Sequence, residues 1–141
     1  MTGARALHLL AEDSEDVAVI SATLQDAVAK VGDITFEPRP RRLTIVFNRF
    51  RWEADTKQRI RSALQIGGVL EVKTRKIRRD RPDAVVELLA ISFEPGQPPG
   101  GVFTLTFAGG GDLKVEVECV DAVLADLSEP WPTPRIPSHG A

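Results

Sequence analysis

The chain has 141 residues, of which 43% are hydrophobic and 27% are charged, and this length suits one globular domain rather than two. Its formal net charge is −2, which by itself argues against a nucleic-acid-binding protein or a polybasic membrane module. The single cysteine excludes an intramolecular disulfide, and no apolar run approaches the ~20 residues of a membrane-spanning helix. We therefore expect a protein of the cytoplasm, without a transmembrane segment.

The near-neutral total conceals a strong polarisation along the chain. Between Arg39 and Arg81 there are fourteen Lys and Arg against four Asp and Glu, a local charge of +10. The remaining residues hold four Lys and Arg against sixteen Asp and Glu, a local charge of −12, and the two parts sum to −2. The position of the arginines in the fold therefore matters more than the total.

The N-terminal part predicts a strand followed by a helix. Residues 7–10 form a short apolar run, and Asp13 or Ser14 offers a side-chain oxygen that can cap a helix. An apolar stripe then recurs at helical spacing and ends at Gly32; it comprises Val17, Ile20, Leu24, Ala27, Val28 and Val31. This pattern predicts a helix over about 14–31.

After Gly32 the apolar period changes to two, which is typical of strands. The predicted strands are 34–36, 43–52, 60–66, 69–77, 85–93, 103–107 and 113–117. Gly67 and Gly68 mark a hairpin or a kink, and the last two strands form the clearest hairpin, around three glycines. Asp121 is expected to cap a short helix over about 121–127, and 128–141 is a Pro-rich irregular tail.

The alternation slips within 43–52. Arg49 and Arg51 occupy the phase of Phe47, whereas Phe50 and Trp52 occupy the phase of Val46. A β-bulge near Asn48, or a strand that passes from one sheet face to the other, would reconcile this.

Together these elements predict an α+β fold in one domain, 1–127, followed by the tail. Seven antiparallel strands in meander order would curl into a barrel-like sheet, with the helices at its two ends. Seven strands closed by a C-terminal helix resemble the pleckstrin-homology-like barrel in element order, a fold that carries many functions. An open sheet with both helices on one face is the alternative.

Residues suited to catalysis are few, which favours a non-catalytic domain. His8 and His139 lie at opposite ends of the chain, and no His or Cys residues have metal-ligand spacing, so no metal, cofactor or catalytic residue is predicted. Cys119 has no basic neighbour in sequence to activate it. A small enzyme with carboxylate chemistry at Glu116 and Glu118 remains the alternative, because the two project from one strand face.

The basic segment is the candidate binding surface. Its members are Arg39, Arg41, Arg42, Arg49, Arg51, Trp52, Arg59, Lys73, Arg75, Arg78 and Arg79, with Trp52 as a stacking group. The arginine fork suits phosphate or carboxylate, so the partner would be nucleic acid, a phospholipid headgroup or, more generally, an acidic protein. Two other interpretations are a solvated exterior whose charges pair with local acids, and charge matching with the acidic flanks within the chain or in a homodimer. Trp131 would anchor the tail.

Several stretches resemble a family of small, uncharacterised bacterial proteins that we associate with alphaproteobacteria and that are known only as a domain of unknown function. They are 24–28, 31–33, 48–53, 61–64 and 124–131, so the resemblance covers roughly 6–135. It implies one intact domain and brings no activity, cofactor or catalytic residue.

Overall fold

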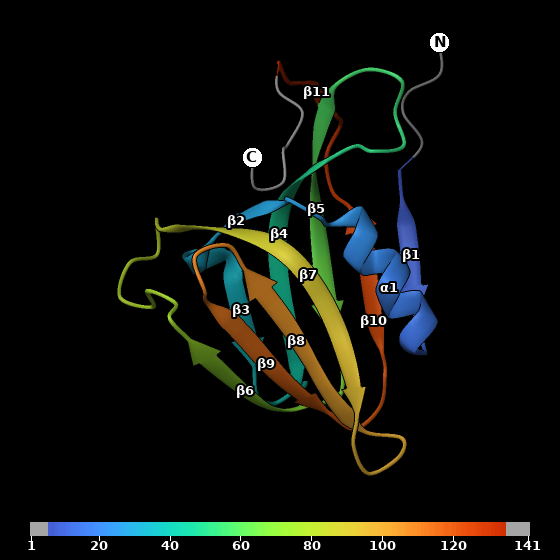
Figure 1. The fold of residues 1–141 in the computed structure, drawn as a ribbon, viewed down its shortest axis with the longest axis vertical. Helices are drawn as coiled ribbons and strands as arrows, with labels where there is room; N and C mark the ends of the chain where they lie inside the picture. Colours follow the sequence, from blue (N-terminus) through green and yellow to red (C-terminus); the bar gives the residue numbers. More distant parts are fainter. Residues whose placement is uncertain (1–5, 135–141) are drawn as a thin grey trace.

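The computed structural model describes residues 6–134, and within them it contains one α-helix and a sheet of eleven strands (Figure 1). In chain order the elements are β1 (His8–Ala11), α1 (Ser14–Thr23), β2 (Val28–Lys30), a 3₁₀ turn η1 (Val31–Asp33), β3 (Ile34–Glu37), β4 (Arg42–Phe50), β5 (Gln58–Ile66), β6 (Val69–Arg75), β7 (Val85–Pro95), β8 (Gly101–Phe107), β9 (Asp112–Val117), β10 (Ala122–Asp126) and β11 (Trp131–Pro132). All strand pairs are antiparallel.

The sheet bends so that its two halves face each other around one hydrophobic core (Figure 1). Its strand order is β1-β10-β5-β4-β2-β7-β8-β9-β6, while β3 pairs with β4 and β11 with β5. One half contributes Phe47 and Leu64 to the core, and the other contributes Phe103 and Val115. The short strand β2 joins the halves, because it pairs with β4 on one side and with β7 on the other.

The predicted helix over 14–31 is too long, since α1 ends at Thr23. Asp13 caps its start, as expected, by accepting a hydrogen bond from the backbone of Asp16 at 2.9 Å. Asp26 then takes a left-handed conformation with φ 64°, and its backbone N–H donates to the carbonyl of Leu88. The end of the apolar stripe therefore enters the sheet as β2, where its pairing with β7 outweighs the helical spacing.

The predicted helix over 121–127 is wrong, because these residues form β10. This strand lies between β1 and β5, with Leu124 opposite Leu9 on one side and Leu64 on the other. As a helix, these five residues would form little more than one turn, with few backbone hydrogen bonds. As a strand, they form backbone hydrogen bonds to a neighbouring strand on each side. The gap that it fills is made by strands distant in sequence.

The seven-strand meander and the closed barrel are also not found. The described residues form eleven strands, and no pairing joins the end strands β6 and β1, so the sheet stays open. The chain leaves β5 through the kink at Gly67–Gly68, and β6 pairs with β9 rather than with β5. Because the closing helix is absent as well, the likeness to the pleckstrin-homology-like barrel is not confirmed. The predicted hairpin of 103–107 and 113–117 is confirmed as β8–β9.

Candidate functional site

Arg49 is buried in the core face of β4 and is 0% exposed. No bulge occurs near Asn48, because β4 and β5 keep one register from Leu43 to Phe50. Arg49 simply continues the inward phase of Phe47, so the slip in the sequence pattern marks a buried charge rather than a backbone irregularity.

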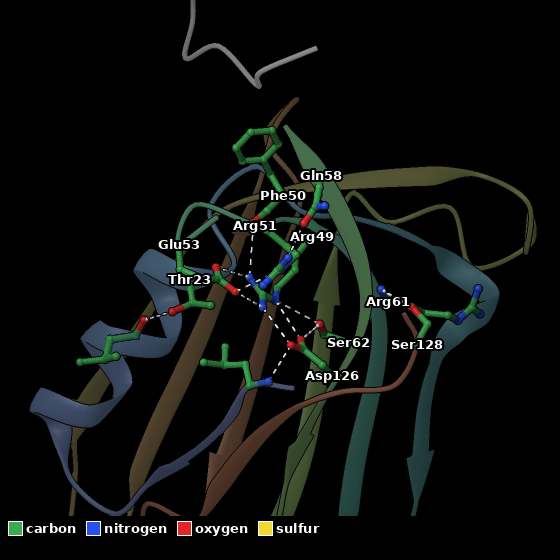
Figure 2. A network of polar contacts seen from close by, with 12 residues as sticks. Thr23, Arg49, Phe50, Arg51, Glu53, Gln58, Arg61, Ser62, Asp126 and Ser128 are labelled. Carbon is green, nitrogen blue, oxygen red and sulfur yellow. Dashed lines mark hydrogen bonds and ion pairs between the residues drawn. The ribbon is translucent and has the colours of Figure 1, made fainter. Parts of the chain in front are cut away.

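The guanidinium of Arg49 is held by two carboxylates and a hydroxyl, which together we call the Arg49 centre: Arg49, Glu53, Ser62 and Asp126 (Figure 2). Its Nε and Nη2 each donate to Asp126 at 3.1 Å, and its Nη1 and Nη2 donate to Glu53 at 3.0 and 2.8 Å. Ser62 accepts from Nε and donates to Asp126 at 2.6 Å. The carboxylate of Asp126 also accepts the backbone N–H of Leu7.

These contacts favour the charged forms of Arg49 and Glu53. Burial acts to lower the pKa of Arg49, but hydrogen bonds and charge attraction from Glu53 and Asp126 outweigh it, so the pKa is raised. The Arg49 hydrogen bond lowers the pKa of Glu53, against the opposing effect of partial burial. Every member has partners inside the chain, so the centre fastens β4, β5, β10 and the residues before β1 together.

The other arginines of the basic segment do not gather into one patch. Arg42 and Phe50 bound the nine residues of β4, which separates Arg39, Arg41 and Arg42 from Arg51, Trp52 and Arg59 by roughly 25 Å at about 3.3 Å per residue. Lys73 and Arg75 lie on β6, and Arg78 and Arg79 lie in the loop that follows it.

Many of these cations are paired with acids from outside the segment. The pairs are Arg41 with Glu118, Arg42 with Glu37, Arg49 with Asp126, Arg61 with Asp33 and Arg75 with Asp112. Much of the polarisation along the sequence is thus matched within the chain. Apart from the buried pair of Arg49 and Asp126, these pairs are exposed on at least one side and contribute little stability, roughly 0–1 kcal/mol each.

The aromatic groups near the end of β4 are only partly accessible. Phe50 is buried and packs against Trp52, with ring centroids 4.6 Å apart, while Trp52 is 40% exposed. Arg51 is half-buried and bonds to Gln58, and Arg59 donates to the carbonyl of Asn48. The alternating Arg and aromatic residues therefore do not form an open stacking surface. Trp131 pairs with Arg59 through β11, and His139 lies outside the described residues.

Glu116 and Glu118 lie at an open depression and not inside an enclosed site. Both are exposed, and the carboxylate of Glu118 is paired with Arg41. They share this depression with backbone and apolar groups around Gly100 and Leu70. The arrangement does not hold the two carboxylates against a common reactant.

A cleft of about 460 Å³ lies between β3 and β6, which do not pair with each other, and we call it the seam cleft. Its floor is Leu43 and Leu113, and the loop 76–84 closes one end, where it is hydrogen-bonded to η1. Its full lining is Val31, Gly32, Ile34, Phe36, Leu43, Val72, Thr74, Ile77, Arg79, Pro82 and Leu113. It is mainly apolar, with one guanidinium, that of Arg79, and one hydroxyl.

On both walls of the seam cleft, side-chain exposure rises sharply from one strand to the next. On β9, Val115 and Leu113 are 0% and 1% exposed, yet their partners on β6, Val72 and Thr74, are half-buried and exposed. On the other wall Leu43 is 1% exposed and its partner on β3, Phe36, is 37% exposed. The core-facing side of the sheet thus extends one strand beyond the core on each side of the cleft. Sequence reasoning missed this site because it joins strands that never pair.

Residues 7–139 match the family described as "Protein of unknown function (DUF2948)". The chain belongs to this family. The match confirms the resemblance found in the sequence and assigns no activity to the DUF2948 chain. No curated protein and no solved structure matches it. Across residues 6–134 no helix has the length and apolar character that crossing a membrane requires, and no cluster of His, Cys, Asp or Glu could hold a metal ion.

Proposed function

We propose that the chain is a non-catalytic binding domain and that its seam cleft receives an apolar group of an anionic partner. The observation that carries this proposal is the loss of cover on both walls, at Phe36 and at Val72, around a volume suited to a ligand group. Filling the cleft would remove this apolar surface from water, which stabilises the complex by about 25 cal/mol for each Å² of apolar surface buried. The cleft holds no acid–base pair or nucleophile beyond Thr74, which supports binding rather than catalysis.

The anionic character of the partner follows from the rim. Arg79 lines the cleft and pairs with no carboxylate of residues 6–134, unlike Arg75 and Arg78 beside it. The loop 76–84 has four Lys and Arg against two Asp, a local charge of +2. We place the binding role of the predicted basic face here, with Lys73, Arg75, Arg78 and Arg79. Residues 1–127 form the domain in this proposal, and 128–141 are appended to it.

The test uses anilinonaphthalene sulfonate, a fluorescent probe that is apolar and carries one anionic group. We expect saturable fluorescence enhancement with the folded protein, lost in Thr74→Trp, whose indole fills the cleft. Thr35→Trp is the matched control, because Thr35 is exposed on the same wall strand as Phe36 but on its other face. Enhancement that persists in Thr74→Trp, or is absent from the wild type, contradicts the proposal. Circular dichroism verifies that each variant is folded.

A further inference from the structure

The strand β6 ends its half of the sheet and has a free edge. Six of its seven residues pair with β9, with a register shift between Val69 and Glu71, and no other strand of residues 6–134 pairs with it. Apart from the N–H of Val69, which donates to the carbonyl of Arg41, its outer edge presents alternate N–H and C=O groups that no neighbouring strand uses. This edge borders the seam cleft, because Val72 and Thr74 line the cleft.

The two faces of β6 differ in chemistry. The face with Val72 and Thr74 continues the core face of β9, as the register with Val115 and Leu113 shows. The opposite face holds the exposed side chains of Glu71, Lys73 and Arg75. A strand laid along the free edge would thus have every second side chain over the apolar cleft and the others beside this charged face.

Charge on the C-terminal half of that outer face favours an acidic neighbour. Glu71 lies opposite Glu116 near the start of the strand, but farther along Lys73 lies directly opposite Lys114, and like charges in this position repel. Arg75 already has a partner in Asp112, but Lys73 forms no ion pair with the described residues. Arg79 adds an unpaired guanidinium at the end of the cleft. A carboxylate on the outer side of an added strand would meet Lys73, and an anionic group at the end of the cleft would meet Arg79.

We infer that the anionic partner of the seam cleft is an extended acidic peptide segment that adds to the free edge of β6 as a further strand. This inference rests on the proposed function and specifies its ligand: apolar side chains alternate with Asp or Glu, the former filling the cleft and the latter facing Lys73 on the outer face. Of the other strands with a single partner, β1 and β3 have only four residues each; β3 forms the opposite wall of the cleft, and β1 borders α1 rather than the cleft (Figure 1).

The test titrates the full chain with acetyl-Glu-Val-Glu-Val-Glu-Val-Glu-amide and follows amide hydrogen exchange by NMR. We expect slower exchange for the edge-facing amides of β6, with β1 unchanged. A peptide of the same composition with its Val residues adjacent should bind at least about tenfold more weakly, because it cannot separate apolar from acidic faces. Protection at β1 instead of β6, or equal affinity for both peptides, overturns the inference.

Methylated peptides test the backbone pairing directly. In a strand only alternate N–H groups face the neighbouring edge, so N-methylation of one alternate set should abolish binding and methylation of the other set should leave it unchanged. Equal binding of both methylated peptides would show that the cleft takes apolar groups without forming a strand, which refutes the inference.

Two charge reversals complete the test. Lys73→Glu should weaken the acidic peptide about tenfold and favour a peptide with Lys in place of Glu. Lys57→Glu, in the loop between β4 and β5, is the matched control and should leave both affinities unchanged. If the sulfonate probe binds the cleft but no peptide protects β6, the inference fails and the proposed function stands, with a small amphipathic anion as ligand. If neither probe nor peptide binds, both fail.

Discussion

The Arg49 centre buries a charged side chain, whereas the seam cleft leaves apolar side chains partly exposed. In the centre, a charge that would be costly to bury is fully covered, because Asp126, Glu53 and Ser62 supply partners from within the chain. In the seam cleft, apolar side chains that would gain from burial are left partly uncovered, at Phe36 and Val72. The buried guanidinium has its hydrogen-bond partners within the chain, whereas the apolar side chains of the cleft remain in contact with water.

This contrast distinguishes a structural role for the Arg49 centre from the binding role that we propose for the seam cleft. In the Arg49 centre each polar member already has a partner within the chain, however conspicuous its residue types are. An apolar cleft between strands, with one unpaired guanidinium, offers both area and a charge. The predictions that follow compare the two regions, starting with the largest expected effect.

Arg49→Met should lower the free energy of unfolding by about 3–5 kcal/mol, because it leaves Asp126, whose side chain is 1% exposed, as an unpaired buried charge. Chemical denaturation measures the loss. Arg41→Met is the matched control, since Arg41 forms an exposed pair with Glu118 and should cost no more than about 1 kcal/mol. Equal losses in the two variants would show that the centre does not fasten the strands.

One substitution made in each region sharpens the comparison. Phe47→Ala empties a site that is 0% exposed and should cost about 3–5 kcal/mol. Phe36→Ala, in the wall of the seam cleft, should cost about 1 kcal/mol, since that ring is 37% exposed, yet it should weaken the sulfonate probe. Denaturation and probe titration together check this. A variant of Phe47 that remains stable, or one of Phe36 that binds normally, would contradict it.

The smallest effect is the contribution of Glu53 to the pH dependence. Its pKa lies below the ordinary value of about 4.5, so its stabilisation is complete above that pH. As the pH falls through this range the unfolded chain binds the proton first, and the stabilisation is lost. Glu53→Gln should therefore be less stable than the wild type near neutral pH, with the difference shrinking below about pH 4.5. Unfolding curves at several pH values measure it, and a constant difference would refute it.

The sequence pattern correctly predicted the elements that are formed by residues close together in the chain. The hairpin of β8 and β9 follows from strict alternation around three glycines, and the cap at Asp13 from a short side chain placed before a helix. Helical spacing misled over 28–31 because Val28 also suits a strand, and the neighbours β4 and β7 that pair with it are distant in sequence. The same reason explains the wrong prediction for β10, because both strands that pair with it, β1 and β5, are distant in sequence.

The candidate sites were harder to predict, for two different reasons. The signal for the Arg49 centre was present, since Arg49 shares the phase of Phe47 and Asp126 shares that of Leu124, but the two residues are 77 positions apart. No pattern shows which two out-of-phase charges meet. The seam cleft is defined by the absence of a strand between β3 and β6, and alternation within a strand does not show what lies beside it.

The place of β10 has a consequence for how the protein is made. β1 pairs only with β10, so His8 meets Ala125 only after nearly the whole described chain has been synthesised. Until then Arg49 lacks its Asp126 partner, and one half of the sheet lacks two of its strands. Contacts of such long separation form slowly. We therefore expect nascent chains that stop before residue 122 to leave this half unassembled, with Arg49 still in water.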